Sequence, residues 1–222
     1  MAEFKEAKRE LHGLTAGGEK RLLLWLAART PSGIGPDHLT LLGFAAMGIA
    51  GVAYARSGAN PAWLHVVNLC LFLNWLGDSL DGTLARFRNR LRPRYGFYVD
   101  HMVDAYGALF VLGGLGVSGL MSERIAAALL VAYLLLHVNI YLATYTLGTF
   151  KISFGPVGGT ELRLLLLALN LLVLRSPRVH LLGRDLLLFD IAGFAGTLGL
   201  TLTLLVSSIG NTRRLYDMER LP

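Results

Sequence analysis

The sequence predicts an all-α integral membrane protein with six transmembrane helices and an N-terminal amphipathic helix at the membrane interface. Hydrophobic residues make up 54% of the 222 positions and charged residues 16%, against about 25% charged residues in soluble domains. Long apolar stretches recur along the chain at the length of membrane helices. Lysines and arginines gather in alternate connections between these stretches, as expected of a chain that crosses a bilayer repeatedly.

The first expected element is the segment EKRLLLWLAAR at residues 19–29. It is too short to span a bilayer, but its leucines, Trp25 and charged flanks suit a helix that lies in the headgroup layer. The alternative is a soluble helix packed on the cytoplasmic face of the protein. Residues 30–36 are rich in Pro and Gly and end this helix, and Asp37 is expected to cap the first span.

The apolar stretches define six expected spans. A helix needs about 20 residues to cross the hydrocarbon core, and fewer where the bilayer thins. The fifth span is the shortest, with Glu161 and Arg163 at its start, and the third carries Gly107 and the glycine-rich residues 113–116. These glycines favour close approach of another helix, within the fold or in a dimer. The spans are residues 39–54, 61–80, 97–120, 124–147, 162–174 and 186–209.

The distribution of basic residues predicts that both termini are cytoplasmic. With six spans, 16 of the 21 lysines and arginines fall on the side that holds the termini, and cytoplasmic loops carry such an excess. The net charge of +6 therefore reflects membrane topology and attraction to anionic lipids, so no nucleic-acid partner is expected. The five basic residues on the other side are Arg56, Arg124, Arg175, Arg178 and Arg184.

Four aspartates gather at the facing ends of the second and third spans. Asp78 and Asp81 are three residues apart and Asp100 and Asp104 four apart, so each pair lies on one helix face. A short basic turn joins the two helices, so we expect antiparallel neighbours whose aspartates converge near the cytoplasmic surface. Such carboxylates need a counter-charge. Mg²⁺ or Mn²⁺ suits carboxylate oxygens, whereas the single cysteine, Cys70, excludes a thiolate metal site.

Small and basic residues flank these aspartates. Gly82 and Ala85 leave room beside their helix for a bulky ligand, and Gly96 gives the same clearance on the opposite helix. Arg86 offers a planar fork of donors suited to phosphate. Each glycine alone also fits helix packing, and the arginines from residue 88 to residue 94 are expected to face lipid headgroups.

Residues 78–104 resemble the signature of the CDP-alcohol phosphotransferases, D-x-x-D-G-x-x-A-R followed by G-x-x-x-D-x-x-x-D. Every signature residue is present, but the spacer has nine residues where eight are usual. The extra residue falls in the turn, where it is accommodated at little cost. The residues PDHLT at 36–40 are similar to the family's entry to its first span. The matching residues are Asp78, Asp81, Gly82, Ala85, Arg86, Gly96, Asp100 and Asp104.

The resemblance implies a six-helix, commonly dimeric enzyme of phospholipid synthesis with a polar cavity open to the cytoplasm. A substituted phosphate would pass from a CDP-linked donor to an alcohol acceptor, with CMP as the leaving group. The four aspartates would bind two Mg²⁺ or Mn²⁺ ions on the donor's diphosphate, and Asp104 would be the base. The donor would contact Gly82, Ala85, Arg86 and Gly96.

Three regions follow from this interpretation. Residues 1–36 would form a cytoplasmic segment with the interfacial helix, residues 37–210 the six-helix transmembrane catalytic domain, and residues 211–222 a cytoplasmic tail. Lys151, Ser153 and residues 158–163 form a second polar cluster on the cytoplasmic side. This cluster either forms a wall of the acceptor pocket or caps and orients the fifth helix.

The signature is shared by enzymes with different substrates. Some use CDP-diacylglycerol with a small polar alcohol, and others use CDP-choline or CDP-ethanolamine with diacylglycerol. His101 directly after Asp100 resembles the form found in the aminoalcohol enzymes, whereas the chain length matches compact members, many of which use CDP-diacylglycerol. We favour CDP-diacylglycerol.

Two other classes of protein are alternatives to an enzyme. A divalent-cation transporter also needs intramembrane carboxylates. Its pathway requires polar groups through the whole bilayer depth, whereas the aspartates cluster near one surface and the fourth and sixth spans are almost wholly apolar. A non-catalytic lipid-binding scaffold leaves the four aspartates without a purpose.

Overall fold

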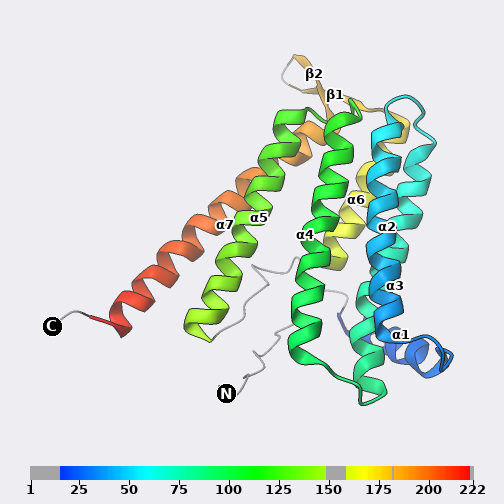
Figure 1. The fold of residues 1–222 in the computed structure, drawn as a ribbon. Helices are drawn as coiled ribbons and strands as arrows, with labels where there is room; N and C mark the ends of the chain where they lie inside the picture. Colours follow the sequence, from blue (N-terminus) through cyan, green and yellow to red (C-terminus); the bar gives the residue numbers. More distant parts are fainter. Residues whose placement is uncertain (1–15, 149–158, 182, 221–222) are drawn as a thin grey trace.

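The computed structural model describes residues 16–148, 159–181 and 183–220, which form seven helices and one β-hairpin (Figure 1). The long helices run roughly along one direction, with the hairpin at one end of the molecule and α1 at the other. The helices are α1 (Ala16–Arg29), α2 (Pro36–Ser57), α3 (Trp63–Phe87), α4 (Pro93–Val117), α5 (Glu123–Leu147), α6 (Gly159–Arg175) and α7 (Leu188–Met218).

Helices α2 to α7 each coincide with one of the six predicted apolar stretches, which confirms the helical fold class. Helix α6, with 17 residues, is the shortest of these, as expected. Among the described helices, α2, α5 and α7 are long and apolar enough to cross a membrane by length and composition.

The sequence did not predict the short hairpin that lies between α6 and α7. Strands β1 (Arg178–Leu181) and β2 (Arg184–Leu187) pair antiparallel, and Gly183 in the turn adopts a φ of +75°. Nearly all of the strand residues are exposed, so neither strand has the buried apolar face on which the recognition of a strand from sequence depends. The last predicted span therefore started two residues too early, at Leu186 instead of Leu188.

Helix α1 is a surface helix at the end of α3 (Figure 1). Leu23 and Ala27 are buried in a cluster with leucines of α2 and α3. Leu22, Leu24 and Trp25 remain exposed. Residues 19–29 are therefore helical, with one face packed on the protein and exposed apolar side chains on another.

A single carboxylate ties α1 to two other helices. Glu19 accepts hydrogen bonds from the Trp75 indole N–H at 2.9 Å, the Ser79 hydroxyl at 3.2 Å and the Thr160 hydroxyl at 3.2 Å. Trp75 and Ser79 belong to α3, whereas Thr160 lies in the first turn of α6. Glu19 therefore joins α1, α3 and α6.

The predicted capping role of Asp37 is wrong. Gly35 is the N-cap residue of α2, and its backbone N–H donates to Nδ1 of His38 at 3.0 Å. Pro36 fills the first helical position, where the missing N–H needs no partner. Asp37 instead lies in the first turn and forms an ion pair with Arg92 of the turn before α4.

Helix α2 lies between α3 and α4 (Figure 1) and packs against both. Close packing with α4 depends on glycines, because a Cβ on Gly114 would lie 2.1 Å from the carbonyl oxygen of Gly51. Gly107 and Gly116 also face neighbouring side chains, whereas a Cβ on Gly113 would meet no atom of the described chain within 4 Å. Of these four glycines in the second half of α4, all but Gly113 thus serve packing inside the fold.

Replacing Gly114 with Ala should destabilise the protein, because the new methyl group meets backbone that cannot rotate away. Overpacking of this kind costs about 1–3 kcal/mol or more. Thermal unfolding in detergent should show a lower midpoint for Gly114→Ala than for the unmodified protein. Gly113→Ala makes the same change in open space and should leave the midpoint unchanged or slightly raised. Equal midpoints for the two variants would contradict this packing.

Polar side chains also connect helices inside the apolar core. The Tyr54 hydroxyl donates to Oδ1 of Asn170 at 2.9 Å, and Nδ2 of Asn170 donates to Oδ1 of Asn68 at 2.7 Å. Asn170 and Tyr54 are fully buried, so these bonds satisfy groups that would otherwise be costly in the core. They fix α6 against α2 and α3. Cys70 is buried in the same core.

Candidate active site

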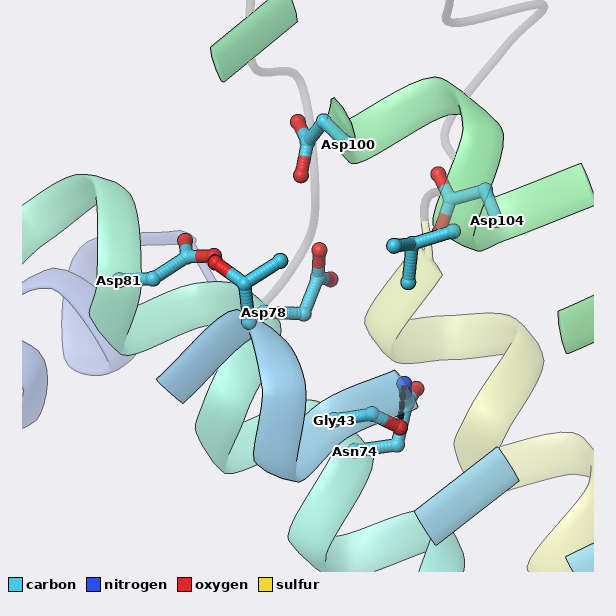
Figure 2. Close-up of a pocket in the computed structure, with 8 residues that line it drawn as sticks. Gly43, Asn74, Asp78, Asp81, Asp100 and Asp104 are labelled. Carbon is cyan, nitrogen blue, oxygen red and sulfur yellow. Dashed lines mark hydrogen bonds between the residues drawn. The ribbon is translucent and has the colours of Figure 1, made fainter. Parts of the chain in front are cut away.

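The four predicted aspartates line one pocket. Asp78 and Asp81 project from the last turns of α3, and Asp100 and Asp104 from the first turns of α4, toward the space between the two helices (Figure 2). The other residues that line the pocket are Thr40, Gly43, Asn74 and Val103. The convergence expected from the spacing of the aspartates is therefore present in the structure.

The convergence has a different basis from the one predicted. We expected α3 and α4 to be direct neighbours, but in the described chain they do not pack along each other, and both pack on α2. The start of α2 contributes Thr40, whose hydroxyl donates to Oδ2 of Asp81 at 2.6 Å. The sequence motif at residues 36–40 was the only signal for this contribution.

Asn74 extends the site one turn below Asp78 on α3. Its Nδ2 donates to the backbone carbonyl of Gly43 at 3.2 Å (Figure 2). This bond fixes the orientation of the amide group, so that its oxygen faces away from Gly43. That oxygen accepts a bond from Nε of Arg163 at 2.8 Å. No sequence motif singled out Asn74, because a polar residue three or four positions from an aspartate on a helix is common.

Arg163 brings α6 into the site. Its Nη2 donates to Oδ2 of Asp78 at 2.8 Å while Nε holds Asn74, so the guanidinium spans both residues. The side chains of Arg163 and Asp78 are 17% and 32% exposed. The sequence placed Arg163 in the second polar cluster, without connecting it to an aspartate. The members Lys151, Ser153 and Gly158 of that cluster lie outside the described residues.

Open space surrounds the small residues of the signature. A Cβ on Gly96 would meet no described atom within 4 Å, and one on Gly82 would meet only the guanidinium of Arg86, at 3.7 Å. By contrast, a Cβ on Gly77 would lie 2.5 Å from the carbonyl oxygen of Leu39. In the described chain, Gly82 and Gly96 therefore do not serve helix packing. Ala85 is half-buried and Arg86 is exposed, which leaves the arginine accessible to a ligand.

Arg88 has a structural role that the sequence did not predict. Its guanidinium donates to the backbone carbonyls of Ile34 at 2.6 Å, Thr30 at 2.7 Å and Pro31 at 3.0 Å. These bonds hold the loop before α2 against the end of α3. Arg88 thus satisfies backbone acceptors, whereas we had expected it to face lipid headgroups.

His101 does not line the pocket with the aspartates. Its ring packs against Phe97 and Tyr141, with ring centroids 4.3 Å and 5.0 Å away, and its Nδ1 lies 2.5 Å from the carbonyl oxygen of Phe97. Its position after Asp100 therefore directs it toward α5 and away from the acidic pocket.

The side chains of the pocket fit a hard divalent cation in their chemistry. They offer carboxylate, hydroxyl and amide oxygens, the ligand types that Mg²⁺ and Mn²⁺ prefer. As they stand, no three His, Cys, Asp or Glu residues of the described chain are grouped closely enough to hold a metal ion. Ion binding would therefore require the carboxylates to draw together, and Asp78 to share or leave Arg163.

Comparison with known families agrees with the signature. The family model described as CDP-alcohol phosphatidyltransferase matches residues 34–205. The match begins just before α2, runs through all four aspartates and ends within α7. It covers most of the chain, and together with the apolar helices it indicates an integral membrane protein. The chain belongs to the CDP-alcohol phosphatidyltransferase family.

Proposed function

We propose that this protein transfers a substituted phosphate from a CDP-linked donor to the hydroxyl of an alcohol acceptor and releases CMP. The family supports a phosphotransferase of lipid biosynthesis. The observation that carries the finer proposal is the single pocket in which α3 and α4 present four carboxylates beside the open positions of Gly82 and Gly96. A nucleotide diphosphate needs both a site for counter-ions and clearance for a bulky group.

In the proposed reaction, the acceptor oxygen attacks the donor phosphorus that carries the alcohol substituent. The bond between that phosphorus and the bridging oxygen breaks, and CMP leaves with the electron pair. The proton of the attacking hydroxyl passes to a carboxylate oxygen of Asp104. A positioned base of this kind typically contributes about 10²–10⁴-fold to a rate.

We propose that Asp78, Asp81, Asp100 and Asp104 bind two Mg²⁺ or Mn²⁺ ions in this reaction. Bound ions would neutralise the diphosphate and the charge that develops on CMP. Thr40 supports this arrangement by donating to Oδ2 of Asp81, and the backbone N–H of Gly82 donates to Oδ1, so both bonds orient the carboxylate. Such a bond to a ligating carboxylate is typical of metal sites.

We further propose six membrane spans with both termini and the active site on the cytoplasmic side, and a homodimer as the assembled form. The six apolar helices α2 to α7 and the excess of basic residues at the α1 end support this topology. Leu22, Leu24 and Trp25, which are exposed on α1, support an interfacial position for that helix.

The decisive experiment incubates purified full-length protein in detergent with CDP-diacylglycerol, CDP-choline or CDP-ethanolamine and a panel of acceptor alcohols. CMP release that requires both a donor and an acceptor supports the proposed reaction, and we expect it with CDP-diacylglycerol. Release with a CDP-aminoalcohol and diacylglycerol would assign the alternative substrate pair. Absence of CMP from every combination, in protein that is folded and monodisperse, would contradict the proposal.

Arg86→Lys should weaken use of the donor while turnover with saturating donor changes less. Lysine keeps the charge but loses the planar pair of donors that matches phosphate oxygens. We expect the KM for the CDP donor to rise about tenfold, the loss of one good hydrogen bond to a charged group. Arg90→Lys makes the same exchange in the turn that follows and should leave KM unchanged. Identical donor titrations for Arg86→Lys and the unmodified protein would remove Arg86 from the donor site.

A further inference from the structure

Arg163 is held in place by more than its ion pair. Its Nε bonds to Oδ1 of Asn74, and the Asn74 amide is fixed in turn by the carbonyl oxygen of Gly43. The guanidinium folds back across the start of its own helix, where a Cβ on Gly159 would lie 3.2 Å from Nη1. Thr160, in the same turn, is bonded to Glu19. The side chain of Asn74 and the start of α6 therefore hold the Arg163 guanidinium beside Asp78.

The position of Arg163 bears directly on cation binding at Asp78. Its Nη2 lies 2.8 Å from Oδ2 of that carboxylate. Because a divalent cation binds an oxygen at about 2.1 Å, an ion on the same oxygen would lie within about 5 Å of the guanidinium nitrogen. A charge of +1 and one of +2 at this separation repel strongly in a partly buried site.

We propose that Arg163 is a built-in counter-cation that competes with a divalent cation for Asp78. This inference rests on the metal site of the proposed function. Arg163 neutralises one of the four carboxylates, which lowers the repulsion among them when the site carries no ion, and it weakens the binding of a free ion. Arg163 is thus a positioning residue that acts through Asp78.

A free ion should therefore bind weakly, because it must compete with Arg163 for Asp78. Another ligand can offset the loss of that ion pair. A CDP compound carries the diphosphate that supplies this compensation, since its oxygens add ligands and negative charge. Binding of the ion and of the CDP donor would then be coupled, and each would raise the affinity for the other by the same factor.

The test measures Mn²⁺ binding to full-length protein in detergent, without any CDP compound, by the electron paramagnetic resonance signal of free Mn²⁺. Arg163→Gln removes the charge and should tighten Mn²⁺ binding about tenfold, the worth of one partly exposed charge-assisted hydrogen bond. Arg163→Lys keeps the charge and should bind Mn²⁺ with nearly the same affinity as the unmodified protein. Arg175→Gln makes the same change in the last turn of the same helix, where the arginine is exposed, and should bind as the unmodified protein does.

Unchanged or weaker Mn²⁺ binding by Arg163→Gln would overturn the proposal and make Arg163 a support of the site. A second measurement uses unmodified protein, in case Arg163→Gln does not fold. Mg²⁺ should shift the NMR resonance of the Arg163 Nε–H group, identified by its absence from Arg163→Lys, and an unshifted resonance at saturating Mg²⁺ would also overturn the proposal.

The outcomes separate this inference from the proposed reaction. Tighter Mn²⁺ binding by Arg163→Gln without CMP release from the unmodified protein would support the role of Arg163 and contradict the reaction. CMP release with equal Mn²⁺ affinities would support the reaction and contradict the role of Arg163. Absence of Mn²⁺ binding from every variant would contradict the metal site and, with it, the role of Arg163.

Discussion

Removal of divalent cations should abolish CMP release, and added Mg²⁺ or Mn²⁺ should restore it. Four carboxylates line one pocket, and a diphosphate brought among them would add negative charge to a site that is already acidic. Without ions the donor would be repelled, so the loss should be complete within the detection limit. The measurement is CMP release after treatment with a chelator, with the metal content verified by elemental analysis.

The control for this experiment is readdition of each ion in excess of the chelator. Activity that returns with Mg²⁺ or Mn²⁺, but not with the chelator supplied as its Ca²⁺ complex, would show that the reaction requires Mg²⁺ or Mn²⁺. Undiminished turnover in buffer shown to be free of metal would exclude the proposed mechanism, although it would leave the family assignment intact.

Asp104→Asn should lower turnover by about 10²–10⁴-fold, the usual contribution of a positioned general base. Asparagine has nearly the same shape but cannot accept the proton of the attacking hydroxyl, and any loss of metal ligation would deepen the defect. The fold and part of the affinity for the CDP donor should survive, because Asp78, Asp81 and Asp100 remain. CMP release and donor affinity by calorimetry measure the two effects separately.

Three further variants make the Asp104 result specific. Asp78→Asn and Asp81→Asn should weaken donor binding as well as turnover, because these carboxylates are proposed to hold the ion on the diphosphate. Asp185→Asn, on the exposed hairpin at the opposite end of the molecule, should change neither quantity. Near-normal turnover by Asp104→Asn would transfer the role of base to Asp100, the neighbouring carboxylate of α4 that also lines the pocket.

The helices and the aspartates were predictable because their signals are local. Apolar stretches of membrane-helix length identify α2 to α7 directly, and the spacing of three and four residues places each aspartate pair on one helix face. Asp37 shows the limit of such reasoning. The residue type suits a cap, but Gly35 holds that position and Asp37 pairs with Arg92 from a distant turn.

The parts of the site that the sequence did not reveal come from long-range contacts. Thr40 and Asp81 are 41 positions apart, and Arg163 and Asp78 are 85 apart, so neither pair leaves a trace in local spacing. Arg163 in particular occurred in a segment with its own plausible local use, the orientation of the fifth helix. The position of α2 between α3 and α4 was equally hidden, because a short turn between two helices suggests direct neighbours.

The hydrogen bonds from three side chains to Glu19 extend the structural unit beyond the part of the chain that defines the family. The family match begins at residue 34, after α1 has ended. Yet Glu19 of α1 bonds to Ser79, the neighbour of Asp78, and to Thr160, three residues before Arg163. A chain trimmed to the matched region would lose Glu19 and, with it, the hydrogen bonds that link α3 to α6 through α1. Helix α1 therefore helps to position the residues of the site, and a chain shortened for crystallisation or fusion should keep it.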